Sequence, residues 1–589
     1  MELKEYYCKM MEINSMDDLE KRAEATKELI EQLNKEEMPE YFNWAEEVFE
    51  GIHVKERGDQ PALLWVNIDN WNEKRYTYSE FASKSNQLLN YLRKKGVEKG
   101  SVVYAMIPLF PEIWFVSYAT LKGGQVLVPT ATTMTAKELE YRFKVYPPDA
   151  VLADTASAAL IDDALNASGA KPKVKIVVEG NRDGWSGYEE VEKESTEAAA
   201  EKTKPSDPIL CFFTSGTTGM PKRVVHTATS YPLGHLSTLY IIGIKPGDVH
   251  NNLSQPGWAK YAWSSFFSPL SGGATTTGFY TSVRLDPARY LEAIDKYGVT
   301  TFCAPPTAWR AFIVLDLSKY KFEKLRESVS AGEPLNPEII NIWKEATNTV
   351  VRDFYGQTES TAMIGNPPWN KDKVVPGSFG GPSFMYDIVL LDDDGNEITK
   401  PDEPGHIAVR LSNWRPIGLF KEYLGGADQM KEVFRGNYYY TGDKASYDEK
   451  GNWWFVGRSD DVIKSSDYRV GPFEVESALV EHEAVVEAAV VGSPDPKRWQ
   501  LVKAFVILKE GYEPSRELAL DIFKHCKEIL ARFKVPRIIE FVNEVPKTIS
   551  GKIRRIELRE MEVAAKKEGK KGEHEYFYDD FPELKSSQK

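Results

Sequence analysis

The chain has 589 residues, of which 42% are apolar and 28% are charged, and its formal net charge is −14. This length exceeds one ordinary domain, so we expect several lobes. The acidic balance argues against a nucleic-acid-binding protein that works through a general basic field. From Asp461 onward the charges nearly balance, with 23 basic and 24 acidic residues. This relative enrichment in cations would suit an anionic ligand bound by the last part of the chain. The alternative is that it reflects only chance and a Lys-rich tail.

The spacing of the cysteines and the composition of the N-terminus predict the cellular compartment of the protein. The four cysteines are far apart in sequence and form no CxxC pair: Cys8, Cys211, Cys303 and Cys526. This spacing argues against a disulfide framework or a structural zinc site and fits a reducing compartment. The N-terminus lacks an apolar signal region, and the most apolar stretch, 102–121, is interrupted by Pro108 and Pro111. We predict a cytoplasmic protein without a membrane span.

The first half of the chain predicts alternating helices and strands. Amphipathic helices are expected at 17–35 and 40–50, and further helices at 78–95 and 135–146. Short apolar runs predict strands at 102–106, 126–129, 150–153, 174–178, 209–214, 299–304, 328–331 and 350–355. This order is typical of an α/β fold with mainly parallel sheets covered by helices.

The pattern changes twice in the second half. Between 380 and 455, short strands separated by turn signals predict a small antiparallel, barrel-like subdomain. A new α+β pattern follows, with strands at 485–493 and 503–509 and a helix at 516–533. We therefore expect an N-terminal helical extension (1–40), a large domain (41–459) and a small C-terminal domain (460–589). The charged tail from about 563 is predicted to be largely mobile over its last 25 residues.

The strongest local signal is a Gly/Thr-rich loop directly after the apolar run at 209–214. Its candidate phosphate-binding residues are Thr214, Ser215, Gly216, Thr217, Thr218, Gly219 and Lys222. Glycines allow a tight turn with exposed N–H groups, and the hydroxyls and the lysine suit a polyphosphate. Pro221 and Arg223 break the Walker A pattern, which excludes a P-loop kinase.

This loop, TSGTTGMPK, resembles the phosphate loop of the adenylate-forming enzymes, which include acyl-CoA synthetases, luciferases and peptide-synthetase adenylation domains. Five further segments resemble family motifs in family order: 330–335 (SAGEPL), 353–359 (DFYGQTE), 439–443 (YYTGD), 457–461 (GRSDD) and 546–553 (PKTISGKI). The resemblance extends from about residue 40 to 560 and is nearest to the medium-chain acyl-CoA synthetase branch. It implies an AMP-forming ligase with a mobile C-terminal domain.

The resemblance assigns roles to individual residues. It implies that Lys552 bridges the α-phosphate of ATP and the substrate carboxylate, that Thr358 donates to the α-phosphate, and that Glu359 binds Mg²⁺. Asp443 would accept from the ribose hydroxyls with Arg458 nearby, and Asp460 would be the hinge. The remaining nucleotide contacts implied are Gly332, Glu333, Pro334, Asp353, Phe354, Tyr355, Gly356 and Gln357.

The substrate pocket is expected in the segment 254–263. Its candidate residues are Trp258, Ala259, Lys260, Trp263 and Gly356, with Phe266 as a further aromatic wall. No Asp or Glu occurs from Gln255 to Leu285, and an amino-acid substrate would need such a partner for its ammonium group. Acetate-specific relatives carry Trp at the position of Gly356. We therefore expect a short-to-medium, branched or aromatic carboxylic acid.

The residues expected to meet CoA follow the hinge: Ser466, Asp467, Tyr468, Arg469, Arg498 and Lys534. Asp467 occupies a position where the family has glycine, and its side chain and charge oppose passage of an anionic ligand. The leading hypothesis is an AMP-forming acyl-CoA synthetase using ATP, Mg²⁺ and CoA. An acyl-adenylate synthetase with poor or altered acceptor use is the alternative, and a non-catalytic nucleotide sensor is the third reading. Oligomeric state is open.

Overall fold

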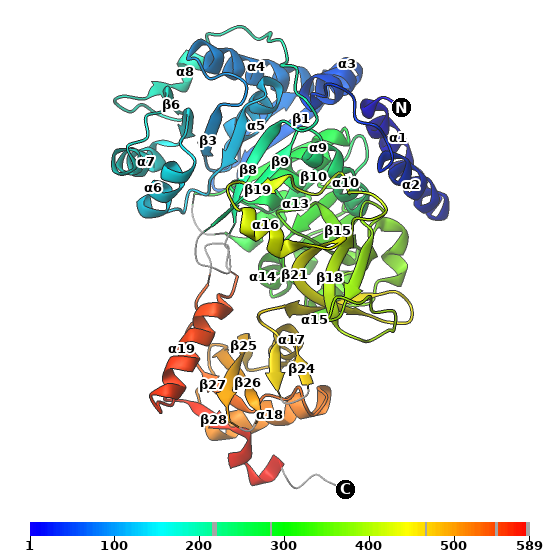
Figure 1. The fold of residues 1–589 in the computed structure, drawn as a ribbon, viewed down its shortest axis with the longest axis vertical. Coiled ribbons are helices and arrows are strands. Elements are labelled where there is room, and N and C mark those ends of the chain that lie inside the picture. Colours follow the sequence, from blue (N-terminus) through cyan, green and yellow to red (C-terminus); the bar gives the residue numbers. More distant parts are fainter. Residues whose placement is uncertain (215–220, 283–284, 466–467, 497, 548–551, 585–589) are drawn as a thin grey trace. The chain divides into compact units, whose positions relative to one another are not determined.

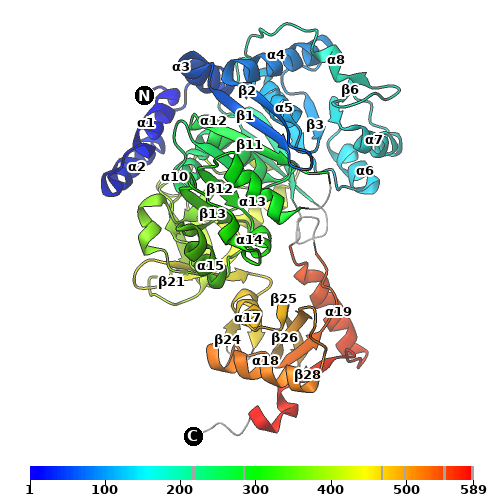
Figure 2. The ribbon, with the colours of Figure 1, turned by 180° about the vertical axis from the view of Figure 1, so that it is seen from behind.

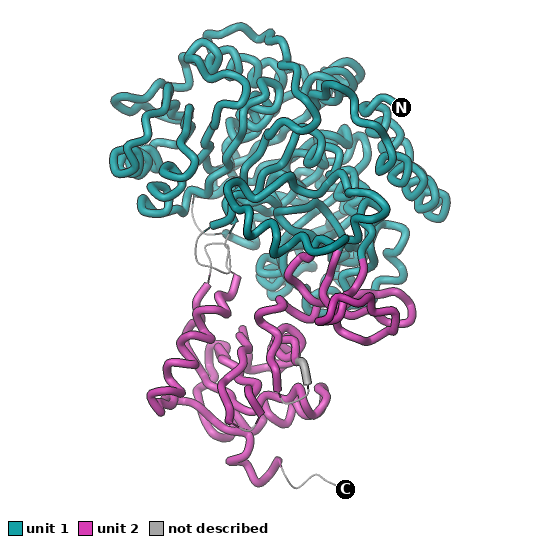
Figure 3. Tube along the Cα trace, viewed as in Figure 1, with its two compact units in different colours: residues 1–388, 409–439 teal, residues 389–408, 440–589 magenta. Residues whose placement is uncertain are grey.

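The computed structural model describes residues 1–214, 221–282, 285–465, 468–496, 498–547 and 552–584 (Figure 1). The chain divides into two compact units (Figure 3). The first comprises residues 1–388 and 409–439, and the second comprises residues 389–408 and 440–589. Asp460 therefore lies inside the second unit, and a hinge at this residue stays a prediction.

A nine-stranded sheet crosses the first unit (Figure 2). Its strands, in spatial order, are β16 (Gly381–Pro382), β15 (Ala362–Gly365), β14 (Val351–Gly356), β13 (Glu327–Ala331), β12 (Thr301–Ala304), β10 (Val249–Asn252), β11 (Thr275–Tyr280), β1 (Pro61–Asn67) and β2 (Asn72–Thr77). The pairs from β14 to β1 are parallel, and both edges are antiparallel. Phe302, Trp309 and Trp343 are buried in the core beside this sheet.

An eight-stranded sheet forms the other half of the first unit. Its order is β19 (Glu422–Tyr423), β9 (Lys222–Thr227), β8 (Pro208–Thr214), β4 (Val126–Pro129), β3 (Val102–Met106), β5 (Ala150–Ala153), β6 (Val174–Val177) and β7 (Ser186–Gly187). The strands from β8 to β7 are parallel, whereas β9 pairs antiparallel with both β8 and β19. Two of the predicted contact residues lie at carboxyl-terminal strand ends: Thr214 ends β8 in this sheet, and Gly356 ends β14 in the other.

Helices follow many of the strands of both sheets. Apolar residues recur along the helical segments of the sequence because one face or the whole surface of each such helix is buried. The helices of the first unit are α1 (Leu3–Asn14), α2 (Leu19–Leu33), the π-helix η1 (Ala45–Val54), α3 (Lys55–Arg57), α4 (Tyr78–Lys94), α5 (Pro111–Gly123), α6 (Ala136–Val145), α7 (Thr155–Ser168), α8 (Tyr188–Val191), α9 (Ser230–Gly234), α10 (Leu236–Ile242), α11 (Ala259–Tyr261), the π-helix η2 (Ala262–Phe267), α12 (Ser268–Ser271), α13 (Pro287–Lys296), α14 (Pro306–Ile313), α15 (Pro337–Thr347) and α16 (Ala427–Val433). Capping boxes start α4 at Thr77 and α6 at Thr135. No helix among the described residues is long and apolar enough to cross a membrane.

The second unit holds most of a small sheet, together with a six-stranded sheet. The small sheet has the order β17 (Ile388–Leu391), β18 (Gly405–Arg410), β21 (Tyr438–Tyr447) and β20 (Phe434–Arg435), with β22 (Trp453–Arg458) beside β21. The six-stranded sheet has the order β24 (Tyr468–Val470), β23 (Ile463–Ser465), β26 (Trp499–Leu508), β27 (Ile538–Phe541) and β28 (Glu575–Phe577), with β25 (Val485–Asp495) beside β26. Its helices are α17 (Pro472–Val480), α18 (Arg516–Ile529) and α19 (Arg555–Lys567).

The α/β fold class is confirmed, and most predicted strands agree with the structure within two residues. The prediction of a mobile tail is wrong for its described part. Strand β28 pairs with β27, and Phe581 and Leu584 are buried in the core of the C-terminal domain. The prediction failed because it was based on the many charged residues of this segment and did not consider its few apolar residues, which pack into the core. Within the expected N-terminal helical extension, α1 was not predicted as a separate helix, although Tyr6, Tyr7 and Met10 on it are fully buried.

Candidate active site

The predicted phosphate loop lies between two paired strands. Thr214 ends β8 and is opposite Lys222, the first residue of β9. The hairpin therefore brings the first and last candidate residues of the loop side by side. The predicted contacts Ser215, Gly216, Thr217, Thr218 and Gly219 lie outside the described residues.

Tyr423 connects this hairpin to the predicted magnesium ligand. Strand β19 pairs with β9 and places the Tyr423 ring 4.7 Å from the Lys222 ammonium. The Tyr423 hydroxyl donates to Glu359 Oε1 at 2.8 Å, and the Phe420 N–H donates to the Glu359 carbonyl at 2.8 Å. Both Lys222 and Glu359 are therefore held at one site by residues that sequence reasoning missed.

His226 fixes the backbone of Thr358. Its Nε2 lies 2.7 Å from the Thr358 carbonyl, and its Nδ1 lies 3.1 Å from the Ser230 hydroxyl. Burial lowers the pKa of His226 to about 3, so the ring is neutral. The Thr358 carbonyl can only accept, so the single ring proton lies on Nε2, and Nδ1 accepts from the Ser230 hydroxyl, whose oxygen also accepts from Thr227 N–H at 2.8 Å. The proton on Nε2 then donates to the Thr358 carbonyl.

Two of the predicted nucleotide-binding segments lie at the adjacent ends of β13 and β14. Ser330 is opposite Asp353 in this parallel pair. Asp353 is 6% exposed, and burial raises its pKa to about 8 despite hydrogen bonds from backbone N–H groups. Gly332 has φ 109°, and a Cβ there would meet no atom within 4 Å. No side chain therefore packs over Gly332 directly after β13, and the next residues, Glu333 and Pro334, are half-buried.

The end of β14 is half-buried rather than enclosed. Tyr355, Gly356, Gln357, Thr358 and Glu359 all retain partial exposure, while Phe354 before them is buried. The Gln357 N–H donates to the Ser360 hydroxyl at 3.0 Å, which turns the chain after the strand. The predicted contact residues therefore form one continuous accessible edge.

Gly356 has no room for a side chain. A Cβ there would lie 2.2 Å from the Thr361 carbonyl oxygen and 2.6 Å from Trp263 Cη2. Trp263 is 5% exposed, and its Nε1 donates to the Tyr231 hydroxyl at 2.6 Å. Glycine is therefore needed here, because any side chain would meet the Thr361 backbone and the Trp263 indole, and the expectation that it lengthens the pocket stays a prediction.

The predicted acyl-pocket residues separate onto two faces of one helical segment. Trp263 faces Gly356, and the Lys260 ammonium donates to the Ala331 carbonyl at 3.2 Å. Trp258 instead lines a cavity of about 20 Å³ together with Tyr261 and Phe266. Ala259 and Trp258 are half-buried. Trp263 therefore contacts Gly356 of the nine-stranded sheet, whereas Trp258 lines the cavity.

The predicted ribose residues lie in the second unit. Asp443 on β21 is opposite Arg458 on β22, so these two residues are neighbours as expected. Asp443 is 8% exposed, and its N–H donates to the Thr441 hydroxyl at 3.2 Å. The pair places one carboxylate and one guanidinium on adjacent strands.

Asp460, the predicted hinge residue, contacts the helix that follows the predicted catalytic lysine. Arg559 on α19 donates to the Asp460 carbonyl and lies 2.8 Å from Asp461 Oδ1. Arg458 Nε lies 3.5 Å from Asp460 Oδ1. Sequence reasoning missed Arg559, which links the Asp460 segment to α19 within this unit.

Lys552 lies beside an isolated β-bridge. Lys547 and Ile553 form an antiparallel bridge, and the Arg554 N–H donates to the Pro546 carbonyl at 2.8 Å. Lys552 is exposed next to this bridge, immediately before α19. This position suits an ammonium group that must be presented to a ligand.

The predicted CoA contacts are only partly described. Ser466 and Asp467 lie outside the described residues, and Tyr468 and Arg469 belong to β24. Lys534 donates to Glu474 at 2.6 Å, so its charge already has a partner. Arg498 is exposed. The pKa of Arg537 is lowered, first by burial and then by the nearby positive charge of Arg498. Arg537 is thus a further cation beside Arg498 that the sequence did not reveal.

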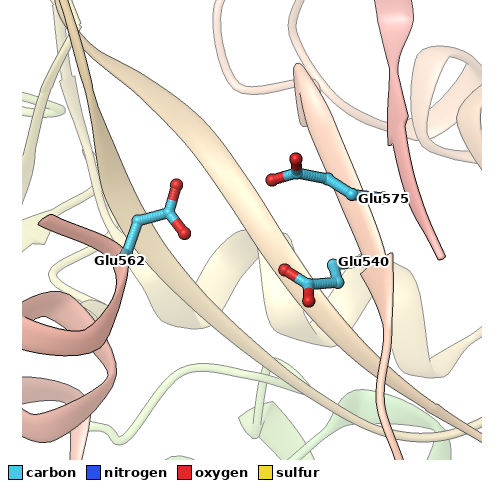
Figure 4. A group of neighbouring side chains, drawn as sticks. All are labelled: Glu540, Glu562 and Glu575. Atoms are coloured by element: carbon cyan, nitrogen blue, oxygen red, sulfur yellow. The ribbon is translucent and has the colours of Figure 1, made fainter. Parts of the chain in front are cut away.

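Three glutamates in the second unit turn their carboxylates toward one another: Glu540, Glu562 and Glu575 (Figure 4). The Lys503 ammonium lies 2.7, 2.6 and 2.6 Å from them, respectively. Burial disfavours the charged form of Lys503, but hydrogen bonds to the three carboxylates outweigh it, so its pKa is raised. The cluster is an ion-pair network that joins α19 to the sheet.

Replacement of Lys503 by methionine should destabilise this domain by about 3–5 kcal/mol, because it leaves buried carboxylates without their counter-ion. Chemical denaturation of the full chain, followed by circular dichroism, measures the loss. Lys570→Met is the matched control, since Lys570 pairs with Glu568 at the surface, and we expect no measurable change. Equal stability of the Lys503→Met protein and the control would contradict the structural role of the network.

Comparison with known proteins identifies the family. The sequence profile of the AMP-binding enzyme family matches residues 52–424, and that of the AMP-binding enzyme C-terminal domain matches residues 474–552. The chain therefore belongs to the AMP-binding enzyme family, as the motifs predicted. It is an ATP-dependent acid–thiol ligase, an AMP-forming acyl-CoA synthetase that uses ATP, Mg²⁺ and CoA.

Similar proteins agree along nearly the whole chain. It is 56% identical over 539 residues to 4-hydroxybutyrate--CoA ligase 1 of Metallosphaera sedula, covering 91% of this chain and 93% of that protein. It is 39% identical to the human mitochondrial acyl-coenzyme A synthetase ACSM3, covering 89% and 90%. Among solved structures, the anthranilate CoA ligase AuaEII in complex with anthranoyl-AMP has a TM-score of 0.81 at 29% identity, covering 90% and 99%.

Proposed function

We propose that this enzyme activates short-to-medium carboxylic acids whose chains are uncharged, and that it completes the transfer to CoA. The observation that carries the proposal is the absence of Asp and Glu from Gln255 to Leu285, around the helical segment that holds Trp258 and Trp263. A distal ammonium group would have no carboxylate partner in this segment, and its burial would carry a large desolvation cost. The name of one similar protein, 4-hydroxybutyrate--CoA ligase 1, supports an acid within this size range.

The proposed residue roles follow from the charges that must be brought together. In the first step a carboxylate oxygen attacks the α-phosphorus of ATP, and the bond to pyrophosphate breaks. Lys552 would neutralise charge between the two anions, while Lys222, Thr214 and the loop after it would hold the departing pyrophosphate. Glu359 offers a carboxylate oxygen, the ligand type that Mg²⁺ prefers, and Tyr423 orients it at 2.8 Å.

In the second step the CoA sulfur attacks the acyl carbonyl carbon, the thiol proton is lost, and AMP leaves. We propose rotation at Asp460 between the two steps, because the first needs a dry, highly charged site and the second an open one. Asp443 and Arg458 would bind the ribose, and Arg498, Arg537 and Arg469 would meet the CoA phosphates. A reducing compartment is proposed for the enzyme, namely the cytoplasm, since Cys8, Cys211, Cys303 and Cys526 are free thiols.

An enzyme that adenylates acids but passes them poorly to CoA remains the second candidate, because Asp467 stands where the family has glycine. If Asp467 obstructs CoA, the variant Asp467→Gly should raise thioester formation about tenfold and leave acid-dependent pyrophosphate release within twofold. Full thioester yield from the unaltered enzyme, one per pyrophosphate, would eliminate this candidate. Glu513→Gly, which removes an exposed acidic side chain of the same domain, is a control for a general charge effect.

A further inference from the structure

A groove of about 670 Å³ opens on the first unit, at the far end of the β8–β9 hairpin from the predicted phosphate loop. The phosphate loop connects Thr214 to Lys222, whereas the groove reaches Thr227, which is opposite Pro208 at the other end of the same strand pair. Its volume is in the range of small-molecule sites, about 300–1,000 Å³. None of the residues that line it has a role in the proposed reaction, so the groove is distinct from the candidate active site.

The wall of this groove combines apolar side chains with two cationic groups. The Arg415 guanidinium lies 5.2 Å from the centre of the Phe434 ring and donates to the Phe420 carbonyl at 2.8 Å. The Lys421 ammonium donates to the Ser206 carbonyl at 3.3 Å. Because the residues that they contact all line the groove, both charged groups lie at its wall. The apolar part of the wall includes Ile417, Leu419, Phe420, Met430 and Phe434.

Neither of these cations is matched by a carboxylate. Among the described residues, no Asp or Glu lines the groove, and the partners of Arg415 and Lys421 are neutral carbonyls. The third cation, Lys431, is instead paired with Asp428 at 3.1 Å. Arg415 and Lys421 are exposed, so a ligand can reach them, and the guanidinium has five donors of which one is used. The chemistry suits a ligand with one anionic head and an apolar body.

Hydrogen bonds connect this wall to the predicted magnesium ligand. The Phe420 N–H donates to the Glu359 carbonyl at 2.8 Å, while the Phe420 carbonyl accepts from Arg415. Ser230, which also lines the groove, donates to the buried His226 that holds the residue before Glu359. A ligand that draws the guanidinium toward its own charge therefore weakens a contact that supports the backbone beside Glu359.

We propose that this groove is a regulatory site for an alkyl carboxylate, whose chain covers the apolar wall while its head binds Arg415 and Lys421. Occupancy shifts Phe420 and, with it, Glu359, so the affinity for MgATP falls. The inference goes beyond the proposed function and rests on it only for the role of Glu359. Since such coupling is reciprocal, MgATP weakens binding of the carboxylate by the same factor.

The probe that tests the proposal is decane-1-sulfonate, used below its micelle-forming concentration. It has an anionic head and an alkyl chain, but it is not a carboxylic acid and is therefore not a substrate. With saturating pentanoate, it should raise KM for MgATP by about fivefold or more. The concentration that gives half of this effect should rise about tenfold in Arg415→Gln and in Lys421→Gln, because each variant loses one charged contact. Calorimetric titration of the full chain should show one site, with a higher Kd when MgATP is present.

Lys319→Gln is the matched control, because Lys319 is an exposed lysine outside the groove that pairs with Asp316. It should respond to the probe as the unaltered enzyme does. Methanesulfonate, which has the head without the chain, and 1-decanol, which has the chain without the charge, should leave KM for MgATP unchanged.

Three results would overturn the inference. If higher pentanoate removed the effect, the probe would be acting in the acyl pocket. An equal response of Arg415→Gln, Lys421→Gln and the control would show that the groove is not the site. Binding without a change in KM for MgATP would show that the groove is not coupled to Glu359. Absence of acid-dependent pyrophosphate release with every uncharged acid would instead refute the proposed function, and the titration would still test the groove.

Discussion

Replacement of Lys552 by alanine is expected to lower acid-dependent adenylation by about 10²–10³-fold, the loss typical of removing one group that stabilises developing charge. Lys552 is exposed beside the Lys547–Ile553 bridge, immediately before α19, and its role in the first step is a prediction from its motif. Pyrophosphate release with a saturating acid measures the first step. Thioester formation from preformed acyl-adenylate and CoA measures the second, which should stay within about threefold of the unaltered enzyme.

Lys547→Ala is the matched control for this loop. Lys547 is in the same segment, but its ammonium donates to Glu487 at 2.6 Å. We expect its adenylation rate to remain within about threefold. If Lys552→Ala retained full pyrophosphate release, or if it lost both steps equally, the assignment of Lys552 to the first step would be wrong.

Gly356→Ala is expected to reduce adenylation about 10²-fold, with a destabilisation of about 1–3 kcal/mol. The added methyl group would lie 2.2 Å from the Thr361 carbonyl oxygen and 2.6 Å from Trp263. Since the Thr361 oxygen belongs to the backbone, the strand end must move, and Gln357, Thr358 and Glu359 would move with it. Pyrophosphate release and thermal unfolding together measure both effects.

Gly51→Ala provides the control for glycine replacement, because Gly51 lies in the π-helix η1 and a Cβ there would meet its nearest atom at 3.1 Å. It should leave adenylation unchanged. A Gly356→Ala enzyme with normal stability and turnover would show that the end of β14 is not held as closely as the structure indicates.

Local sequence patterns were sufficient for the strands and the motif segments. Apolar runs such as Val102–Met106 and Ala150–Ala153 coincide with β3 and β5, because buried parallel strands need continuous apolar residues. The motifs also indicated correctly that Thr214 and Lys222 belong together and that Asp443 and Arg458 are neighbours. In each pair the two residues are separated by one short connection, so local pairing is enough.

The residues that sequence reasoning missed act over long distances along the chain. Tyr423 orients Glu359 across 64 residues, and His226 holds Thr358 across 132. Such contacts depend on sheet order, which no local pattern encodes. The close approach of Trp263 to Gly356 was not predicted for the same reason, since it is determined by tertiary packing. The separation of Trp258 from Trp263 likewise required the structure.

One measurement tests the central claim most directly: product stoichiometry with ATP, Mg²⁺ and CoA over a panel of acids that includes 4-hydroxybutyrate, pentanoate, a dicarboxylic acid and an amino acid. We predict one AMP, one pyrophosphate and one thioester per turnover with the uncharged acids, and negligible product with the two acids that carry a distal charge or an ammonium group. Formation of ADP and phosphate, or equal turnover of the charged acids, would contradict the account.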